Sequence, residues 1–258
     1  MITITSAELN AIIAALVFPL ARVLSLLAAA PPFNNATLPT RIRLICGLAV
    51  TAAIAPALEP TPAIELASGT GLLTLAEQML IGYAMGFSLR LVFSAVDLAG
   101  NALSMQMGLG FATTYDPTSS SQTPVVSEFI GVLSLLVFLA IDGHLMVLST
   151  LLESFRVIPI GVLPHKASWA NLANAGAVIF SSGLLLALPI VVTLLITNTA
   201  IAVLGRVAPQ LNIIVIGFPI TITVGFVALY VCLPYFVPPL LNFFENGLLS
   251  MLGNFVIK

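Results

Sequence analysis

Long apolar stretches separated by short polar ones run through almost the whole chain. Six apolar segments stand out, at residues 9–30, 42–58, 72–96, 125–152, 173–204 and 213–241. A helix needs about 20 apolar residues to cross a hydrocarbon core that is about 30 Å thick. The segment 42–58 falls short of this length, because Pro56 and the Glu59-Pro60 pair end it early. The pattern therefore predicts an all-α, membrane-associated protein in which the second segment is too short to span the bilayer.

The composition supports this class. Hydrophobic residues make up 59% of the chain and charged residues 7%, against roughly 25% charged residues in a soluble domain. Mean hydropathy is +1.14, so no soluble fold could bury so much apolar surface. The net charge is −2 and no basic cluster is present, which predicts membrane lipid and no nucleic acid as a partner.

Lysine and arginine in the short loops do not fix an orientation by the positive-inside rule. If the N-terminus lies outside, the charges on the two faces balance: Arg41, Arg43 and Arg206 against Arg156, Lys166 and Lys258. Either the orientation is weakly encoded, or the segments do not simply cross the bilayer six times.

Ionisable side chains within apolar segments are functional hypotheses by default. The candidate polar residues are Arg22, Arg90, Asp97, Asp142 and His144. Arg90 and Asp97 are seven residues apart, so they share a helix face.

Asp142 and His144 flank Gly143, where the pattern predicts a helix break. We expect these two side chains to form a hydrogen-bonded structural pair rather than a proton relay. His144 and His165 are the only histidines, and neither has ligand spacing to a cysteine or carboxylate. Cys46 and Cys232 are predicted to be buried free thiols, and no catalytic motif is present. The sequence therefore predicts no metal, no cofactor and no enzyme activity.

The connection at 105–124 is unusually long for a helix–helix loop. Glycines near its start give the backbone conformational freedom, and its prolines prevent a continuous helix. A run of hydroxyl side chains makes it polar without adding charge. Its methionines can adapt to a surface that seals and then reshapes. The candidate residues in it are Met105, Met107, Gly108, Leu109, Gly110, Phe111, Ala112, Thr113, Thr114, Tyr115, Asp116, Pro117, Ser119, Ser120 and Ser121.

The region 173–241 carries a single charged residue, Arg206, between two long apolar segments. Gly205 and Pro209 bracket a tight turn, which predicts a helical hairpin with Arg206 at its tip. The candidate tip residues are Arg206, Pro209, Gln210 and Asn212. Arg206 either reaches lipid headgroups or contacts a neighbouring protein or helix carbonyls.

Several motifs, taken in order along the chain, resemble those of one known protein family. The loop Gln106-Met-Gly-Leu-Gly-Phe-Ala-Thr-Thr-Tyr-Asp-Pro117, followed by Pro124-Val-Val, resembles the family's loop. Further similarities occur in order along the chain: Arg22 with Pro31, Pro39, Arg41 and Arg43, then Asp142-Gly-His-Leu, Ser154-Phe-Arg-Val-Ile-Pro-Ile-Gly161, Leu188-Pro-Ile-Val, and the stretch 206–219. Together these motifs resemble the FliR family of flagellar export-gate proteins, whose counterpart in virulence type III secretion is the T-subunit family. The sequences Met-Gly-Leu-Gly-Phe and Tyr-Asp-Pro favour the flagellar branch over the virulence branch.

This resemblance implies a place in the flagellar export gate of the bacterial inner membrane, at the basal body and partly at periplasmic level. FliR-like proteins join FliP and FliQ in a pore-forming assembly, alongside FlhB-like and FlhA-like components, through which unfolded proteins pass. It also implies a single FliR-like domain, with a FliP-like part at about 1–165 and a FliQ-like hairpin at about 166–258. The loop 105–124 would be the plug of the closed channel, and the hairpin tip would lie near the cytoplasmic entrance.

Two other classes stay open. A secondary transporter would fit six segments and broken helices, but it predicts an internal repeat, and none is convincing here. An intramembrane enzyme would use Asp142 and His144, but residues two apart do not share a helix face.

Overall fold

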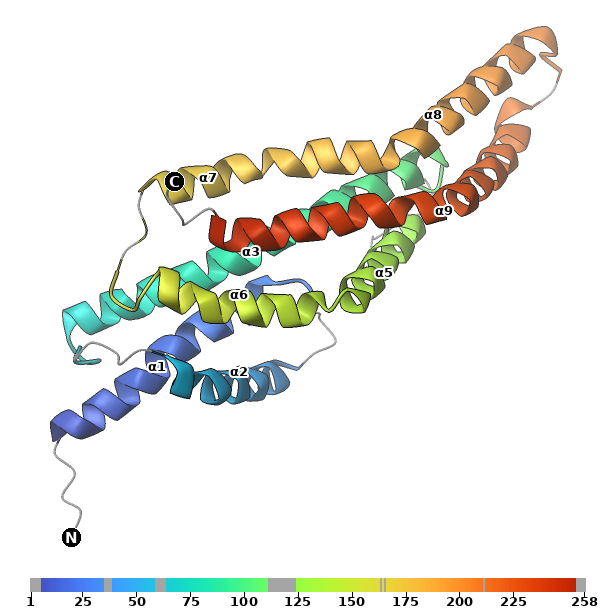
Figure 1. Ribbon diagram of the computed structural model, residues 1–258. Coiled ribbons are helices and arrows are strands. Elements are labelled where there is room, and N and C mark those ends of the chain that lie inside the picture. The colour runs from blue at the N-terminus through green and yellow to red at the C-terminus, as the bar shows by residue number, and fades with distance from the viewer. Residues whose placement is uncertain are drawn as a thin grey trace. The chain divides into compact units, whose positions relative to one another are not determined.

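The computed structural model describes residues 6–34, 39–58, 64–110, 124–162, 164, 166–210 and 212–253. All regular elements in these ranges are helices (Figure 1). They are α1 (Ser6–Ala29), α2 (Thr40–Ile54), the 3-10 helix η1 (Ala55–Ala57), α3 (Gly69–Gln106), α5 (Val125–Ala140), α6 (Gly143–Val157), α7 (Lys166–Ala175), α8 (Ala177–Val207) and α9 (Ile213–Gly253). Within this part of the chain, five helices are long and apolar enough to cross a membrane, or six if α5 and α6 form one broken span. The predicted all-α membrane protein is confirmed.

The second apolar segment, 42–58, is longer in the structure than the sequence pattern predicts. Helix α2 and η1 together cover Thr40–Ala57, 18 residues that qualify as a spanning segment by length and composition. The helix begins before the apolar run because the Pro39 carbonyl accepts bonds from the backbone N–H groups of Ile42 (2.9 Å) and Arg43 (3.3 Å). The prediction that this segment is too short was therefore wrong. The predicted burial of Cys46 was also wrong, since this free thiol is exposed on α2.

The helix α3 is longer than its hydropathy predicts. The apolar pattern ends near residue 96, but the helix continues past Asp97 to Gln106. The residues after Asp97 are mostly small or good helix formers, so one polar position does not stop the helix. The long loop therefore begins on the end of a 38-residue helix.

The chain divides into two compact units that are discontinuous in sequence. One contains residues 1–91, 142–175 and 245–258, and the other contains residues 92–141 and 176–244. The predicted division at about residue 165, into a FliP-like part and a FliQ-like hairpin, follows sequence order and stays a prediction.

In the first unit, α1 and α3 pack closely through two glycines of α3. A Cβ on Gly82 would overlap the Arg22 carbonyl oxygen, and one on Gly86 would lie 2.7 Å from the Ala29 Cβ. Gly82-Tyr-Ala-Met-Gly86 is a small-xxx-small motif of the kind that lets membrane helices approach backbone to backbone. Large apolar side chains fill the core around it: Phe18, Leu26, Ile81, Met85 and Leu89.

In the second unit, an aromatic cluster joins α3, α5 and α9. The ring centroids of Phe93, Phe138 and Phe244 lie 5.1 to 5.8 Å apart in tilted and edge-to-face arrangements, the geometry that aromatic quadrupoles favour. Further along the same pair of helices, a Cβ on Gly100 would lie 2.4 Å or more from atoms of Ser127, so α3 and α5 are in close contact. The helices on either side of the long loop are thus packed together.

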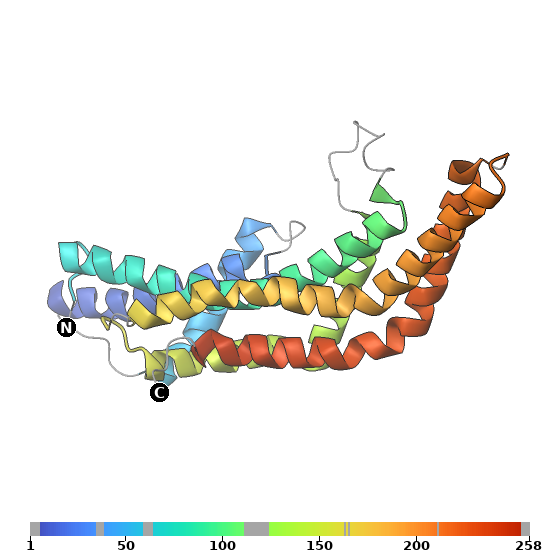
Figure 2. The same cartoon turned by 90° about the horizontal axis from the view of Figure 1, so that it is seen from above.

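The helix α8 and the part of α9 up to Phe244, which belong to this unit, form the predicted hairpin (Figure 2). The turn spans the residues between Val207 and Ile213, and a Cβ on Gly217 of α9 would be 3.4 Å from the Ile201 side chain of α8. Helix α9 continues to Gly253, beyond the predicted end at 241, through four prolines. Membrane helices tolerate proline because neighbouring groups satisfy the freed carbonyls.

Candidate functional site

Arg22 of α1 is fully buried in the first unit. Its Nε and Nη2 both donate to Gln78 Oε1 of α3, the Nε bond measuring 2.8 Å. Its Nη1 donates to the Ser154 carbonyl (2.9 Å) and hydroxyl oxygen (3.2 Å) of α6, and its Nη2 also donates to the Ile158 carbonyl (2.9 Å). These five bonds match the five N–H donors of a guanidinium group.

The partners of Arg22 are neutral oxygens, and within the described residues no carboxylate is paired with it. Ser154 lies in the last turn of α6, and Ile158 is the C-cap of this helix. The Ser154 carbonyl also accepts the backbone N–H of Ile158 (2.9 Å), whereas the final carbonyls of a helix have no N–H partner further along it. The C-terminus of a helix carries partial negative charge, so it offers the cation a favourable environment. The guanidinium carbon also lies 4.2 Å from the centroid of the Phe155 ring, a cation–π distance. Arg22 therefore caps α6 from a different helix.

Sequence reasoning identified Arg22 but missed Gln78, Ser154 and Phe155. A usable signal was present, because Gln78, Gly82 and Gly86 recur every four residues along one face of α3. The small glycines bring α1 close enough for the amide of Gln78 to reach Arg22.

The base of the long loop is fixed in the second unit. Met105 is 73% exposed, whereas Met107 is 0% exposed and packs against α9, where a Cβ on Gly225 would be 2.6 Å from the Met107 Cγ. The backbone then turns through Gly108 with φ of +79°, a conformation that glycine adopts without steric cost. Leu109 and Gly110 follow, and Leu109 donates its backbone N–H to the Ser104 carbonyl (3.0 Å).

The remaining candidate loop residues, from Phe111 to Ser121, lie outside the described residues. Their predicted role as a plug stays a prediction. On the far side, Pro124 is the N-cap of α5, and the Ser127 hydroxyl donates to the Asp97 carbonyl of α3 (3.3 Å).

The hairpin tip carries the predicted polar residues in exposed positions. Arg206 lies in the last turn of α8, and Pro209, Gln210 and Asn212 are exposed in the turn. A cation at a helix C-terminus is favoured by the helix dipole, so Arg206 is compatible with either of its two predicted roles.

The other candidate polar residues do not form a common site. Arg90 and Asp97 are both exposed on α3. Asp142 adopts the left-handed conformation (φ 56°, ψ 28°) and breaks the helix, whereas Gly143 is the first residue of α6. The predicted break at Gly143 was thus one residue too late. The prediction of a hydrogen-bonded pair was wrong, since Asp142 is exposed and His144 Nδ1 has no hydrogen-bond partner.

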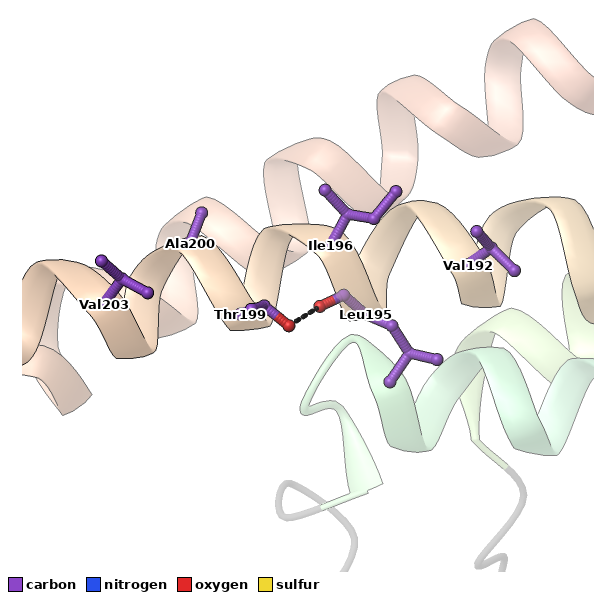
Figure 3. Close-up of a pocket in the computed structure, with 6 residues that line it drawn as sticks. All are labelled: Val192, Leu195, Ile196, Thr199, Ala200 and Val203. Atoms are coloured by element: carbon purple, nitrogen blue, oxygen red, sulfur yellow. Dashed lines mark hydrogen bonds between the residues drawn. The ribbon is translucent and has the colours of Figure 1, made fainter.

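An open apolar groove of about 570 Å³ runs along one face of α8 (Figure 3). It is lined by residues at helical spacing: Val192, Leu195, Ile196, Thr199, Ala200 and Val203. The hydroxyl of Thr199 donates to the Leu195 carbonyl (2.8 Å), so the groove presents a polar atom that is already satisfied. Such a face suits lipid or an apolar partner helix.

Within the described ranges, no group of three His, Cys, Asp or Glu side chains could hold a metal ion. The features that the structure does provide are a buried arginine cap, an anchored loop base and an exposed hairpin.

Comparison with known proteins decides the family. The family of bacterial export proteins, family 1, matches residues 13–247. The flagellar biosynthetic protein FliR of Pectobacterium carotovorum subsp. carotovorum is 39% identical over 259 aligned positions, which cover 100% of this chain and 98% of that protein. The chain belongs to the FliR family of bacterial export proteins.

Other FliR relatives agree. The FliR protein of Escherichia coli strain K12 is 41% identical over 222 positions, covering 86% of this chain and 85% of that protein. The FliR protein of Bacillus subtilis strain 168 is 26% identical, covering 90% and 93%. The protein is therefore a membrane component of the flagellar export apparatus, as the resemblance implied. The family is a structural part of this apparatus and not an enzyme, in agreement with the prediction from the missing catalytic motifs.

Proposed function

We propose that this FliR-family protein is a core subunit of the flagellar type III export gate in the bacterial inner membrane. Together with FliP-like and FliQ-like subunits it forms the channel through which unfolded flagellar proteins cross, next to FlhB-like and FlhA-like components. The loop 105–124 plugs this channel at rest. The hairpin of α8 and α9 is the FliQ-like part, and its tip lies near the cytoplasmic entrance, while other parts of the chain lie at periplasmic level.

The observation that best supports a plug is the fixed base of the loop. At one end Met107 is fully buried against α9. At the other end Pro124 is the N-cap of α5, which packs on α3 through Gly100 and Ser127. A channel plug needs anchored ends to return to the same position after each passage, and a free linker between two helices would not need them.

Exposed apolar surface supports an assembly or a lipid environment rather than a free monomer. The helix α2 exposes Ile42, Leu44 and Ile45, and α8 exposes the groove centred on Ile196 and Thr199. Patches of this kind mark lipid or protein contacts.

Affinity purification tests the assembly. The tagged protein would be extracted from its host with a mild detergent, and the co-purifying chains would be quantified. The proposal expects FliP-like and FliQ-like subunits in fixed proportion. A lone chain or a homodimer that retains small-solute transport would contradict it.

Removal of the loop tests the plug in cells. Deleting residues 110–121 should leave the complex assembled but allow ions and small solutes to pass, so overproduction should slow growth. The matched variant replaces the same twelve residues with a Gly/Ser segment of equal length, which keeps the connection but removes the apolar and aromatic side chains. Normal growth with an assembled deletion variant would argue against the plug.

A further inference from the structure

The first residues of the loop are held in a socket on α9, here called the Met107 socket and formed by Phe218, Thr221 and Gly225. Met107 is fully buried. A Cβ on Gly225 would lie 2.6 Å from the Met107 Cγ, 2.7 Å from its Cε and 2.9 Å from its Sδ. These separations are shorter than normal carbon contacts, so a side chain at position 225 would force Met107 to shift from this position.

The backbone around Met107 contacts the same face of α9. The Thr221 hydroxyl lies 3.3 Å from the Met107 carbonyl oxygen and 3.0 Å from the Phe218 carbonyl oxygen, so one hydroxyl is shared between the loop and its own helix. A Cβ on Gly108 would be 3.2 Å from two carbons of the Phe218 ring. Met107 and Gly108 are thus fitted to α9 by shape more than by strong polar bonds.

This contact is suited to open and close. A methionine side chain is unbranched and adaptable, and it can leave an apolar socket without breaking an ion pair or a covalent bond. The hydroxyl bond to the Met107 carbonyl is long, and Thr221 keeps a second acceptor when that bond is lost. Pro219 lies next to Phe218 of the socket and has no backbone N–H, so α9 lacks one of its helical hydrogen bonds there. The helix is therefore easier to bend at this point.

We propose that Met107 and its socket form a latch that couples α9 to the long loop. While α9 holds Met107, the start of the loop is fixed in the closed position. A shift of α9 near Pro219 withdraws Met107 and releases the loop. This inference rests on the proposed plug function and adds the element that controls the plug.

A double-mutant comparison tests the latch. Gly225→Ala fills the socket, and Met107→Ala empties it. Each should raise the ion leak through the assembled complex by about tenfold, equivalent to about 1.4 kcal/mol. The double variant should leak no more than Met107→Ala alone, because the methyl group at position 225 then has no Cγ to displace. Leaks that multiply in the double variant, or single variants as tight as wild type, would overturn the latch.

Gly217→Ala is the matched control. Gly217 also lies within α9, but a Cβ there would be 3.4 Å from the Ile201 side chain, an ordinary contact. It therefore reports the general effect of alanine in this helix. The control should be as tight as wild type, and a leak as large as that of Gly225→Ala would count against the socket.

Thiol labelling measures the socket without relying on the leak. In a Cys46→Ser, Cys232→Ser background, the thiol of a Met107→Cys variant occupies the position of the Met107 Cγ. A maleimide should label it slowly in the purified complex, and about tenfold faster when Gly225→Ala is added. Equal labelling rates would show that Met107 is not held by Gly225.

A cross-link provides the opposite manipulation. Met107→Cys with Gly225→Cys should form a disulfide on oxidation, since the two side chains share one space. Export should stop and should recover after reduction. Normal export through the cross-linked complex would contradict the latch.

The two proposals fail differently. If the complex lacking residues 110–121 is as tight as wild type, the plug is wrong and the latch falls with it. If that complex leaks but the socket variants do not, the plug stands and only the latch is wrong.

Discussion

Arg22 shows how a cation can be buried in an apolar protein without a carboxylate partner. Its donors are satisfied by Gln78, Ser154 and Ile158, which belong to two other segments of the first unit. Leaving such groups unpaired in a buried site is expensive, because each keeps its desolvation penalty. The arginine therefore connects α1, α3 and the end of α6 by a network that works only when all members are present.

Replacing Arg22 should destabilise the protein severely. Arg22→Ala removes the arginine donors from Gln78 Oε1 and from the Ile158 carbonyl in a buried site, so we expect a loss of about 3 kcal/mol or more. Arg22→Lys should recover part of this, because lysine offers three donors on a point charge instead of a five-donor fork. Thermal unfolding of the purified protein in detergent measures the effect.

Arg90→Ala is the control for Arg22, since Arg90 is exposed on α3 and its loss should change stability by no more than about 0.5 kcal/mol. If Arg22→Ala melts at the same temperature as Arg90→Ala, the network does not stabilise the fold.

At the scale of elements, the close approach of α1 and α3 depends on the glycine motif 82–86. Gly82→Ala places a methyl group against the Arg22 carbonyl, which is backbone and cannot move aside alone. We expect a loss of about 1–3 kcal/mol from overpacking. Gly69→Ala, at the start of the same helix, has no heavy atom within 4 Å of its new Cβ and should be close to neutral. Equal melting temperatures for both variants would show that α1 and α3 do not need this contact.

The role of Arg206 at the hairpin tip can be tested by substitution. If Arg206 contacts a partner subunit or the channel entrance, Arg206→Ala should reduce complex yield or export while membrane insertion is unchanged. Arg206→Lys should restore only part of it, because lysine lacks the planar fork. Arg156→Ala is the control, since Arg156 is also an exposed arginine in the last turn of a helix. Wild-type yield and motility for Arg206→Ala would leave Arg206 as a lipid anchor only.

Helices and their sequence-local turns were predictable, and long-range packing was not. Hydropathy and the Gly205–Pro209 bracket were sufficient for the hairpin of α8 and α9. The end of α3 was missed because hydropathy stops at Asp97, although helix propensity continues. The partners of Arg22 lie 56 to 136 residues away in sequence, and Thr221 is 114 residues from Met107. Apart from the spacing of Gln78 with Gly82 and Gly86, no periodicity in the sequence encodes these pairings.

At the scale of the whole molecule, the described helices leave much apolar surface exposed. In the most apolar window of each candidate span, between 11% and 67% of the residues are buried within the chain. Large apolar side chains remain exposed on α2, α8 and α9. The balance of lysine and arginine between the two predicted faces also fits helices whose surroundings include protein as well as lipid. We expect these surfaces to be covered in the export gate by partner subunits and lipid.

The ion conductance of the purified complex in planar bilayers tests the central claim most directly. If the loop plugs the channel as proposed, the complex containing the wild-type chain should show little conductance. The complex lacking residues 110–121, with the same subunit composition, should conduct ions continuously. If the two complexes are equally tight, the loop does not close the channel, and the seal comes from a partner subunit.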